Sequence, residues 1–389
     1  MEQTDVIYFD NAATSFPKPP QVYSEVRSCM LYSGGNAGRG AHRLSLSASK
    51  KIFDCRMIAA EFFGCDSPER VVFAMNTTYA LNLAIKGLLR AGDRVIISDL
   101  EHNAVYRPIS ELALERGVKY DIFDTKTLEG ISDDKLCEGI ERLIRPDTKM
   151  IICTCSSNIC SRALPIEKIG RICRKHGLVF VVDAAQGAGH IDIDMKRMNI
   201  DVLCVPSHKG LYGPQGCGMA IFGDGVECKE CKTLVEGGNG YDSLNVGMGD
   251  ILPERFEAGT LPAPVIAGLC EGIKSVMAVG IEQIAAYERS LYSRALEMLE
   301  NTEGVHVYAP QYAGSVLLFD ADGFTSERIA AELDRYGICV RGGYHCAALA
   351  HKTLGTHAGG AVRLSFGRYN KMSELETLWR VIKRILAEN

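Results

Sequence analysis

Polar side chains able to bind or move charge follow several short apolar runs of the chain. Asn76, Thr77 and Thr78 come directly after the run RVVFAM. Hydroxyls and free N–H groups at a helix start can bind phosphate, and they can equally serve as a plain helix cap. His102 follows RVIISDLE, where an imidazole could stack on a flat ring, move protons or lie at the surface.

Three more apolar runs end in groups suited to a charged ring. Asp183 and Gln186 follow LVFVV, and a carboxylate at the end of a buried strand needs a cationic partner such as a pyridinium nitrogen. Asn158 follows KMIICTC and could donate to a ring oxygen or simply form a turn. Lys209 follows DVLCVPSH, and a lysine among polar groups can lose its proton and form an imine. A surface lysine beside a turn is the alternative for that position.

The pattern around these residues predicts the elements that position them. From about residue 70 to 225 the chain alternates β-rich runs with helical periodicity, and Gly92, Gly117 and Gly177 are expected helix ends. The alternation predicts an α/β fold with a mostly parallel seven-stranded sheet covered on both faces. Ligands in such sheets bind beyond the carboxyl ends of the strands. The expected strands are RVVFAM, RVIISD, VKYDIF, KMIICTC, LVFVVDAA, DVLCV and GMAIF.

A change of pattern near residue 260 predicts a second domain. Residues 236–262 are rich in Gly and Pro and indicate a long loop. A helical stretch over about 263–300 follows, and strands and helices then alternate up to a final helix from 373. We expect a large domain over 16–260, and a smaller α+β domain made of 1–15 and 261–389.

Composition excludes several classes of partner. The 389 residues carry a formal charge of −5, with no block of basic residues, so neither nucleic acid nor a polyanionic surface is expected. No run approaches the roughly 18 apolar residues of a membrane span. The start MEQTDVIYFD does not resemble a signal peptide. We therefore expect a cytoplasmic protein with no membrane partner.

The chain contains 15 cysteines, an odd number that argues against a fully paired disulfide framework. In a reducing cytosol most should be small buried hydrophobes, as expected for those in apolar runs. These are Cys153, Cys155, Cys173 and Cys204. Cys228 and Cys231 form a CxxC with no second ligand pair at zinc spacing, so we expect a plain surface loop and no metal site.

Cys346 stands apart from the other cysteines. It lies in RGGYHCA, after a predicted strand and in a loop with two glycines, whereas a core cysteine would lie inside an apolar run. The neighbouring His345 could favour the reactive thiolate. We therefore expect Cys346 to be a nucleophile.

Together these motifs resemble the fold-type I pyridoxal-phosphate (PLP) enzymes of aminotransferase class V, and specifically the cysteine desulfurases. The segment at Cys346 is similar to the Arg-x-Gly-His-His-Cys-Ala loop of the branch that includes selenocysteine lyases, with Tyr344 in place of the first His. The matching segments are YFDNAATSFPKP, NTTYALNLA, LEHNA, SSNICSRALPI, VDAAQGAGH, PSHKGLYGPQG, FEAGT, RGGYHCA and VRLSFGRYN.

The resemblance implies a phosphate site and a homodimer. Thr77, Thr78 and His208 would bind the phosphate, and Thr260 would reach the phosphate of the other subunit. The family often places Ser two residues before the His-Lys pair, but here proline stands there and Ser207 comes next. Ser207 would then supply the phosphate hydroxyl from a displaced position, or that hydroxyl would be missing.

The resemblance also implies a role for the groups around the ring. His102 would stack on the ring and act in catalysis, Asn158 would bond its phenolic oxygen, and Gln186 would assist there. Asp183 would pair with the ring nitrogen, and Lys209 would hold the cofactor as an imine and later remove the substrate α-proton.

On the substrate side, the resemblance implies that Arg363 clamps the carboxylate of L-cysteine or a close analogue, with Asn11 and Ala13 near it. His42 matches a family active-site histidine. Cys346 would take the substrate sulfur as a persulfide, alanine would leave, and a sulfur-acceptor protein is a further expected partner.

Other reactions remain open on the same residues. Selenocysteine lysis, sulfinate removal, racemisation and transamination could use the same groups. A non-catalytic scaffold would be expected to lack the lysine or the Asp-x-x-Gln motif, and the chain has both.

Overall fold

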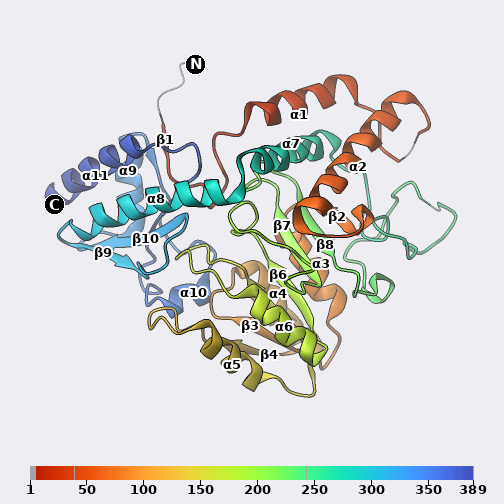
Figure 1. The fold of residues 1–389 in the computed structure, drawn as a ribbon, viewed down its shortest axis with the longest axis horizontal. Helices are drawn as coiled ribbons and strands as arrows, with labels where there is room; N and C mark the ends of the chain where they lie inside the picture. The colour runs from red at the N-terminus through yellow and green to blue at the C-terminus, as the bar shows by residue number, and fades with distance from the viewer. Residues whose placement is uncertain (1–5, 39, 242, 389) are drawn as a thin grey trace.

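The structure is a computed structural model that describes residues 6–38, 40–241 and 243–388. Its centre is a seven-stranded sheet with the order β2-β8-β7-β6-β5-β3-β4 (Figure 1). Every neighbouring pair is parallel except those made by β8, which is antiparallel to both β7 and β2. This confirms the predicted mostly parallel sheet. The strands are β2 (Val71–Ala74), β3 (Arg94–Ser98), β4 (Lys119–Phe123), β5 (Thr148–Thr154), β6 (Val179–Asp183), β7 (Val202–Pro206) and β8 (Gly218–Phe222).

Helices cover both faces of this sheet because its central strands are apolar on both sides. In β7, Leu203 and Val205 join one hydrophobic cluster, whereas Val202 and Cys204 join the other, as the two-residue period of a strand requires. The first cluster includes α2 (Arg43–Phe63), α5 (Asp133–Leu143), α6 (Ile166–His176) and α7 (Ala263–Val279); the second includes α3 (Thr77–Leu88) and α4 (Asn103–Arg116).

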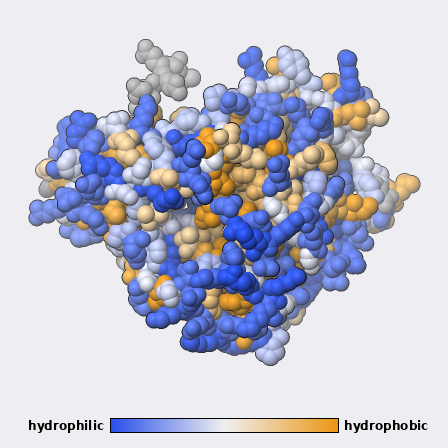
Figure 2. All heavy atoms as spheres, in the orientation of Figure 1, coloured by the Kyte–Doolittle hydropathy of each residue, from blue (hydrophilic) through white to orange (hydrophobic). Residues whose placement is uncertain are grey.

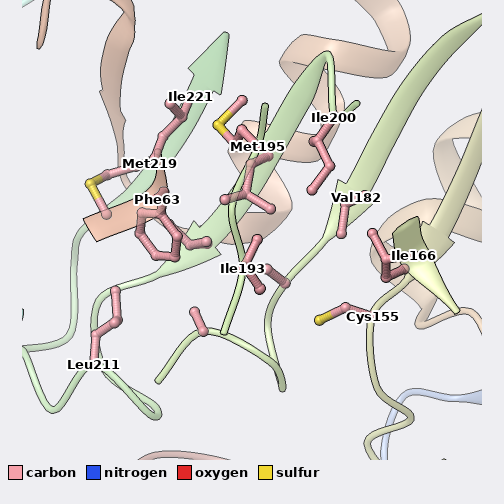
Figure 3. Close-up of a cluster of buried hydrophobic side chains, with 14 of the residues drawn as sticks. Phe63, Cys155, Ile166, Val182, Ile193, Met195, Ile200, Leu211, Met219 and Ile221 are labelled. Carbon is pink, nitrogen blue, oxygen red and sulfur yellow. The ribbon is translucent and has the colours of Figure 1, made fainter. Parts of the chain in front are cut away.

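The first cluster lies directly behind the strands that carry the predicted site. Figure 3 shows Val182 and Ile221 from the sheet packed with Phe63 of α2 and Ile166 of α6. Each of these four side chains has at most 6% of its surface exposed. A core packed this tightly holds the strand ends in fixed relative positions.

Several helix boundaries differ from those expected. α4 and α6 end at left-handed Gly117 and Gly177, as predicted. α3 instead ends at Leu88, before Gly92, because Leu89 adopts an extended conformation. The predicted helix over 263–300 is two helices, α7 and α8 (Ile281–Glu300), which meet at Gly280 with a bend of 81°.

The predicted smaller α+β region is present. Strands β9 (Val305–Tyr308), β10 (Val316–Ala321) and β12 (Val362–Ser365) form an antiparallel sheet of order β12-β10-β9. Helices α8, α9 (Ser326–Arg335) and α11 (Met372–Ala387) share a hydrophobic cluster with it. β1 (Ile7–Tyr8) pairs in parallel with β11 (Ile338–Cys339), so the beginning of the chain lies against this region. The short helix α10 (Ala348–Thr353) precedes β12.

The domain boundary near residue 260 remains a prediction, and residues 1–5 of the predicted small domain lie outside the described residues. α7 packs along α1 (Pro20–Tyr32) and α2, as Figure 1 shows. Its Ile266 and Ile273 belong to the cluster of the seven-stranded sheet. This packing favours a division at the Gly280 bend.

The long loop expected over 236–262 contains no helix or strand in its described part. Figure 2 shows hydrophobic atoms at the right-hand edge of the molecule, where this loop lies. Leu244 and Val246 are almost fully exposed there. Among the described residues, no single helix is long and apolar enough to cross a bilayer; only the bent pair α7 and α8 meets the length and composition test together.

The cysteines divide sharply by exposure. All are free thiols; eleven are buried, three are half-buried, and Cys346 alone is exposed. The CxxC motif lies in a surface segment, with Glu227, Lys229 and Glu230 exposed, but its two cysteine side chains point inward. Cys228 and Cys231 are buried, since the short helix η2 (Cys228–Glu230) packs beneath the end of α3, where Lys232 N donates to Gly87 O at 3.0 Å. No group of three or more potential metal ligands occurs in the described residues.

Candidate active site

A pocket lies at the carboxyl ends of β2, β3, β5, β6 and β7, where the sequence predicted a site. It brings together eight of the predicted residues, because these strands run parallel and their ends meet at one edge. A larger hollow of about 660 Å³ opens elsewhere on the surface, and none of the predicted residues line it. The pocket is lined by Asn76, Thr77, Thr78, Leu81, His102, Ala104, Thr154, Asn158, Asp183, Ala185, Gln186, Pro206, His208 and Lys209.

One end of the pocket has the chemistry of a phosphate site. Thr77 opens α3, and its Oγ1 is buried with no hydrogen-bond partner among the described residues. His208 Nδ1 is buried and unpartnered in the same way. Asn76 Oδ1 caps the helix by accepting from Tyr79 N at 2.9 Å. Unpartnered donors beside a helix N-terminus fit a bound phosphate.

The other end of the pocket holds a buried carboxylate and a buried amine. Burial raises the pKa of Asp183, while the nearby Lys209 opposes that rise. Burial lowers the pKa of Lys209 to about 8, and the charge of Asp183 opposes that change. Asp183 Oδ1 accepts from Ala185 N at 2.9 Å, but no ion pair to Asp183 is formed in the described part of the chain. A pyridinium nitrogen would supply that missing charge.

His102 presents a neutral ring to the pocket. It caps α4, and its Nδ1 accepts from Ala104 N at 3.0 Å, so the ring proton lies on Nε2. Burial, followed by the positive charge of Lys209, lowers its pKa to about 4. An uncharged imidazole at this place suits stacking on a flat ring.

Glu101 is a buried residue whose importance the sequence did not reveal. It is fully buried next to His102, and burial raises its pKa to about 8. Its Oε1 accepts from Ser98 Oγ and from Thr154 N, which ties β3 to β5 below the pocket. The only sequence signal was a carboxylate in the residue before His102.

The turn that carries Lys209 is held by the N-terminal segment, which the sequence analysis also missed. The carbonyl oxygen of His208 accepts from Ser15 N, Thr14 Oγ1 and Lys18 Nζ, at 2.9, 3.1 and 2.8 Å. Ser15 Oγ donates to Lys209 O at 2.9 Å. Several donors therefore fix the main chain on both sides of the amine-bearing residue.

Arg363 connects the small sheet to the pocket. Its Nη2 donates to Asp10 at 2.7 Å and its Nη1 to Asn158 O at 3.2 Å, while its buried Nε has no partner among the described residues. Asn11 donates its amide to main-chain oxygens at both ends of the chain, including Ser365 O at 3.1 Å. Gln186 Nε2 donates to Ala12 O at 3.0 Å, so the N-terminal segment also borders the pocket.

The remaining predicted residues do not line this pocket within one chain. The hydroxyl of Ser207 lies against Gly213, since a Cβ on that glycine would come within 2.2 Å of it. His42 caps α2 by accepting from Ser45 N. Thr260 is exposed and its hydroxyl lies 3.5 Å from Asn36 Nδ2. Ala13 is half-buried beside the pocket wall.

The Cys346 loop lies against the pocket through two main-chain contacts. Asn103 N donates to Cys346 O at 2.8 Å, and Asn158 Nδ2 donates to His345 O at 2.9 Å. That His345 favours the thiolate stays a prediction, and both of its ring nitrogens face other groups, His351 Nε2 and Arg341 O. Burial lowers the pKa of His345 to about 3, so its ring is neutral and offers no positive charge.

Comparisons with known proteins agree with this geometry. The aminotransferase class-V family model matches residues 7–378. A "Probable cysteine desulfurase" of Pyrococcus abyssi is 33% identical, over 98% of this chain and 94% of that protein. A "Cysteine desulfurase" of Shigella sonnei is 30% identical, over 97% and 93%.

Two solved structures are also similar. The apo cysteine desulfurase of Thermococcus onnurineus NA1 superimposes with a TM-score of 0.89 and 32% identity, covering 99% of this chain and 95% of that one. The Escherichia coli cysteine desulfurase CsdA, in an S-sulfonic acid form, superimposes with a TM-score of 0.86 and 25% identity, covering 98% and 95%.

Proposed function

The chain belongs to the aminotransferase class V family, and on that basis we propose that it is a PLP-dependent cysteine desulfurase that forms a persulfide on Cys346. The observation that carries the proposal is that a pocket suited to the cofactor lies next to a loop with an exposed thiol. A pocket ends on the buried Lys209 and Asp183, and the one exposed thiol of the chain lies on a loop bonded to that pocket.

The pocket residues fit PLP. Thr77 and His208 have unpartnered atoms for the phosphate, and Asp183 lacks a cation that the ring nitrogen would provide. His102 would stack on the ring, and Asn158 and Gln186, which also line the pocket, would bond its phenolic oxygen. When bound, the cofactor supplies an aldehyde for amines and a ring that can store an electron pair from the substrate α-carbon.

The protein groups then divide the work. The buried Nε of Arg363 is free to donate to the substrate carboxylate. Lys209, whose pKa of about 8 makes its neutral form accessible, moves the α-proton. The Sγ of Cys346 attacks the sulfur of L-cysteine: an S–S bond forms, the C–S bond breaks, and its electron pair stays with the fragment that leaves as alanine. The persulfide passes to an acceptor protein or is reduced to sulfide.

We place the enzyme in the cytoplasm as a homodimer. An unpaired set of 15 thiols suits a reducing compartment. Met30, Leu31 and Tyr32 at the end of α1 are each at least 60% exposed, and so are Leu244 and Val246 in the loop before Thr260. A second copy could cover these apolar side chains about a two-fold axis, and the resemblance implies that its Thr260 would then reach the phosphate.

The test is release of sulfide and alanine from L-cysteine, with a reductant present, by the purified yellow protein and by Cys346→Ala. We expect equal amounts of both products from the wild type, and none from the variant, which keeps its colour. A wild type that produces neither, although L-cysteine perturbs its absorbance, would refute the substrate assignment. Selenocysteine and cysteine sulfinate would then be compared in the same assay.

A further inference from the structure

The Cys346 loop rests on a hydrogen-bonded pair of histidine rings that lie side by side in nearly one plane. The rings of His345 and His351 lie 5.4 Å apart at an angle of 14°, and His345 Nδ1 is 3.2 Å from His351 Nε2. Both side chains are at least 95% buried. The outer nitrogens also have partners: His345 Nε2 is 3.0 Å from Arg341 O, and His351 Nδ1 is 2.6 Å from Thr356 Oγ1.

Only one arrangement of protons satisfies all three contacts with neutral rings. The Arg341 carbonyl can only accept, so His345 carries its proton on Nε2 and its Nδ1 must accept. His351 therefore donates from Nε2, and its Nδ1 accepts from the Thr356 hydroxyl. Burial, which lowers the pKa values of His345 and His351 to about 3 and 4, keeps both rings neutral. The result is a directed chain from Thr356 through His351 and His345 to Arg341.

This chain supports a strained stretch of backbone. His345 and Cys346 have φ values of 51° and 54°, in the left-handed region that side chains other than glycine rarely adopt. Two consecutive residues keep this conformation only if their surroundings hold them there. Asn158 and Asn103 hold the two carbonyl groups. The hydrogen bond from His351 is the one that fixes the inner side of the His345 ring.

We propose that His351 is a positioning residue for sulfur transfer, acting through His345 to hold the Cys346 backbone in the left-handed conformation that presents the thiol. The proposal rests on the proposed function and deepens it. His351 lies on α10 and does not line the cofactor pocket. Its effect should therefore fall on the step that uses Cys346, and not on binding of the cofactor or of the substrate carboxylate.

The test uses the holoenzyme and three variants. His351→Leu removes the donor, whereas His351→Gln keeps an N–H group at about the place of Nε2. Lys352→Ala alters an exposed neighbour on the same helix and is the matched control. The measurements are kcat and KM for L-cysteine, and amide hydrogen exchange of peptides covering residues 341–361 without substrate.

We expect His351→Leu to lower kcat about 10- to 100-fold, because small misplacement of a reacting group has effects of this size. Its KM should stay within about twofold, since Arg363 is untouched. Exchange in 341–361 should be about tenfold faster. His351→Gln and Lys352→Ala should stay within about threefold of the wild type in both measurements.

Unchanged kcat and exchange in His351→Leu would overturn the proposal, and so would a Gln variant as impaired as the Leu variant, because then packing alone would matter. If His351→Leu does not fold, Thr356→Val is used instead. It removes the hydroxyl that donates to His351 Nδ1, and valine has nearly the same shape as threonine. Wild-type kcat and exchange in Thr356→Val would also overturn the proposal. A wild type that makes no sulfide would refute the proposed function, while exchange would still report on the histidine pair.

Discussion

The Lys209 pocket and the Cys346 loop hold their reactive side chains in different ways. Asp183 is the last residue of a strand of the seven-stranded sheet, and Lys209 and Asn158 follow two other strands. Two hydrophobic clusters fix those strands from both faces. Cys346 lies between β11 and α10, and its left-handed backbone is held by hydrogen bonds from side chains and a neighbouring amide.

This difference implies that the Cys346 loop depends on the Lys209 pocket for its conformation, whereas the pocket does not depend on the loop. The loop takes its support from Asn158, which lines the pocket, and from Asn103 beside it. Among the described residues, no hydrogen bond from the loop holds Lys209. Damage to the loop should therefore leave cofactor binding intact. Damage to the pocket should affect both regions.

The largest effect is expected from the pocket lysine. Lys209→Ala should lower sulfide release at least about 10³-fold, because the residue that moves the proton is lost. Borohydride should attach the cofactor covalently to the wild type and to Cys346→Ala, but not to Lys209→Ala. Covalent attachment in Lys209→Ala, detected by mass spectrometry, would show that another residue binds the cofactor and would refute the role of Lys209.

Arg363→Lys should come next. Lysine offers a point charge in place of a planar fork, so it cannot serve Asp10, Asn158 and a substrate carboxylate together. KM for L-cysteine should rise about 10- to 100-fold, by the loss of a charge-assisted hydrogen bond. Steady-state kinetics check this, and an unchanged KM would place the substrate carboxylate elsewhere.

Asn158→Ala tests the link between the two regions. It removes the donor to His345 O, so we expect kcat to fall about tenfold, consistent with loss of a hydrogen bond to the strained loop. Asn103→Ala is the matched control, because Asn103 holds Cys346 O through its main-chain N–H, which alanine retains. Equal kinetic losses in both variants would contradict the assigned contacts.

The pH dependence of cofactor uptake should show whether Lys209 is a buried amine with a lowered pKa. With the pKa of Lys209 lowered to about 8, its neutral form increases about tenfold between pH 7 and pH 9, and the rate of PLP uptake by the apoprotein should rise alike. Asp183→Asn removes a charge that raises this pKa, so its midpoint should lie lower. If the midpoint of the uptake rate against pH lay near the pKa of an exposed lysine, the amine of Lys209 would not be buried.

The smallest effect near neutral pH is expected in the loop. The folded-state pKa values of His345 and His351, about 3 and 4, lie below the unfolded value of about 6.5. Their stabilising contribution is therefore complete above pH 6.5 and is lost as the pH falls toward 4. Amide exchange of 341–361, corrected for its intrinsic pH dependence, should be flat from pH 7 to 9 and increase below pH 6.

The sequence predicted the site residues that lie at the carboxyl ends of strands. Thr77, His102 and Asp183 could be placed together because the carboxyl ends of parallel strands share one edge. The clamp of Ser15 on Lys209, and the pairing of His345 with His351, had no such pattern. The first joins residues 194 apart in sequence, and the second depends on how α10 packs below the loop.

The segment at Asp10 and Asn11 meets β12 beside the active site, and this orders events during synthesis. Asn11 bonds the main chain of Ser365, 354 residues later, and Asp10 pairs with Arg363. A ribosome therefore makes the lysine long before the arginine and the strand that receive the N-terminal segment. A polypeptide made only as far as a residue before Arg363 would carry the amine without the arginine, so the capacity to liberate sulfide would arise only after β12 has been made.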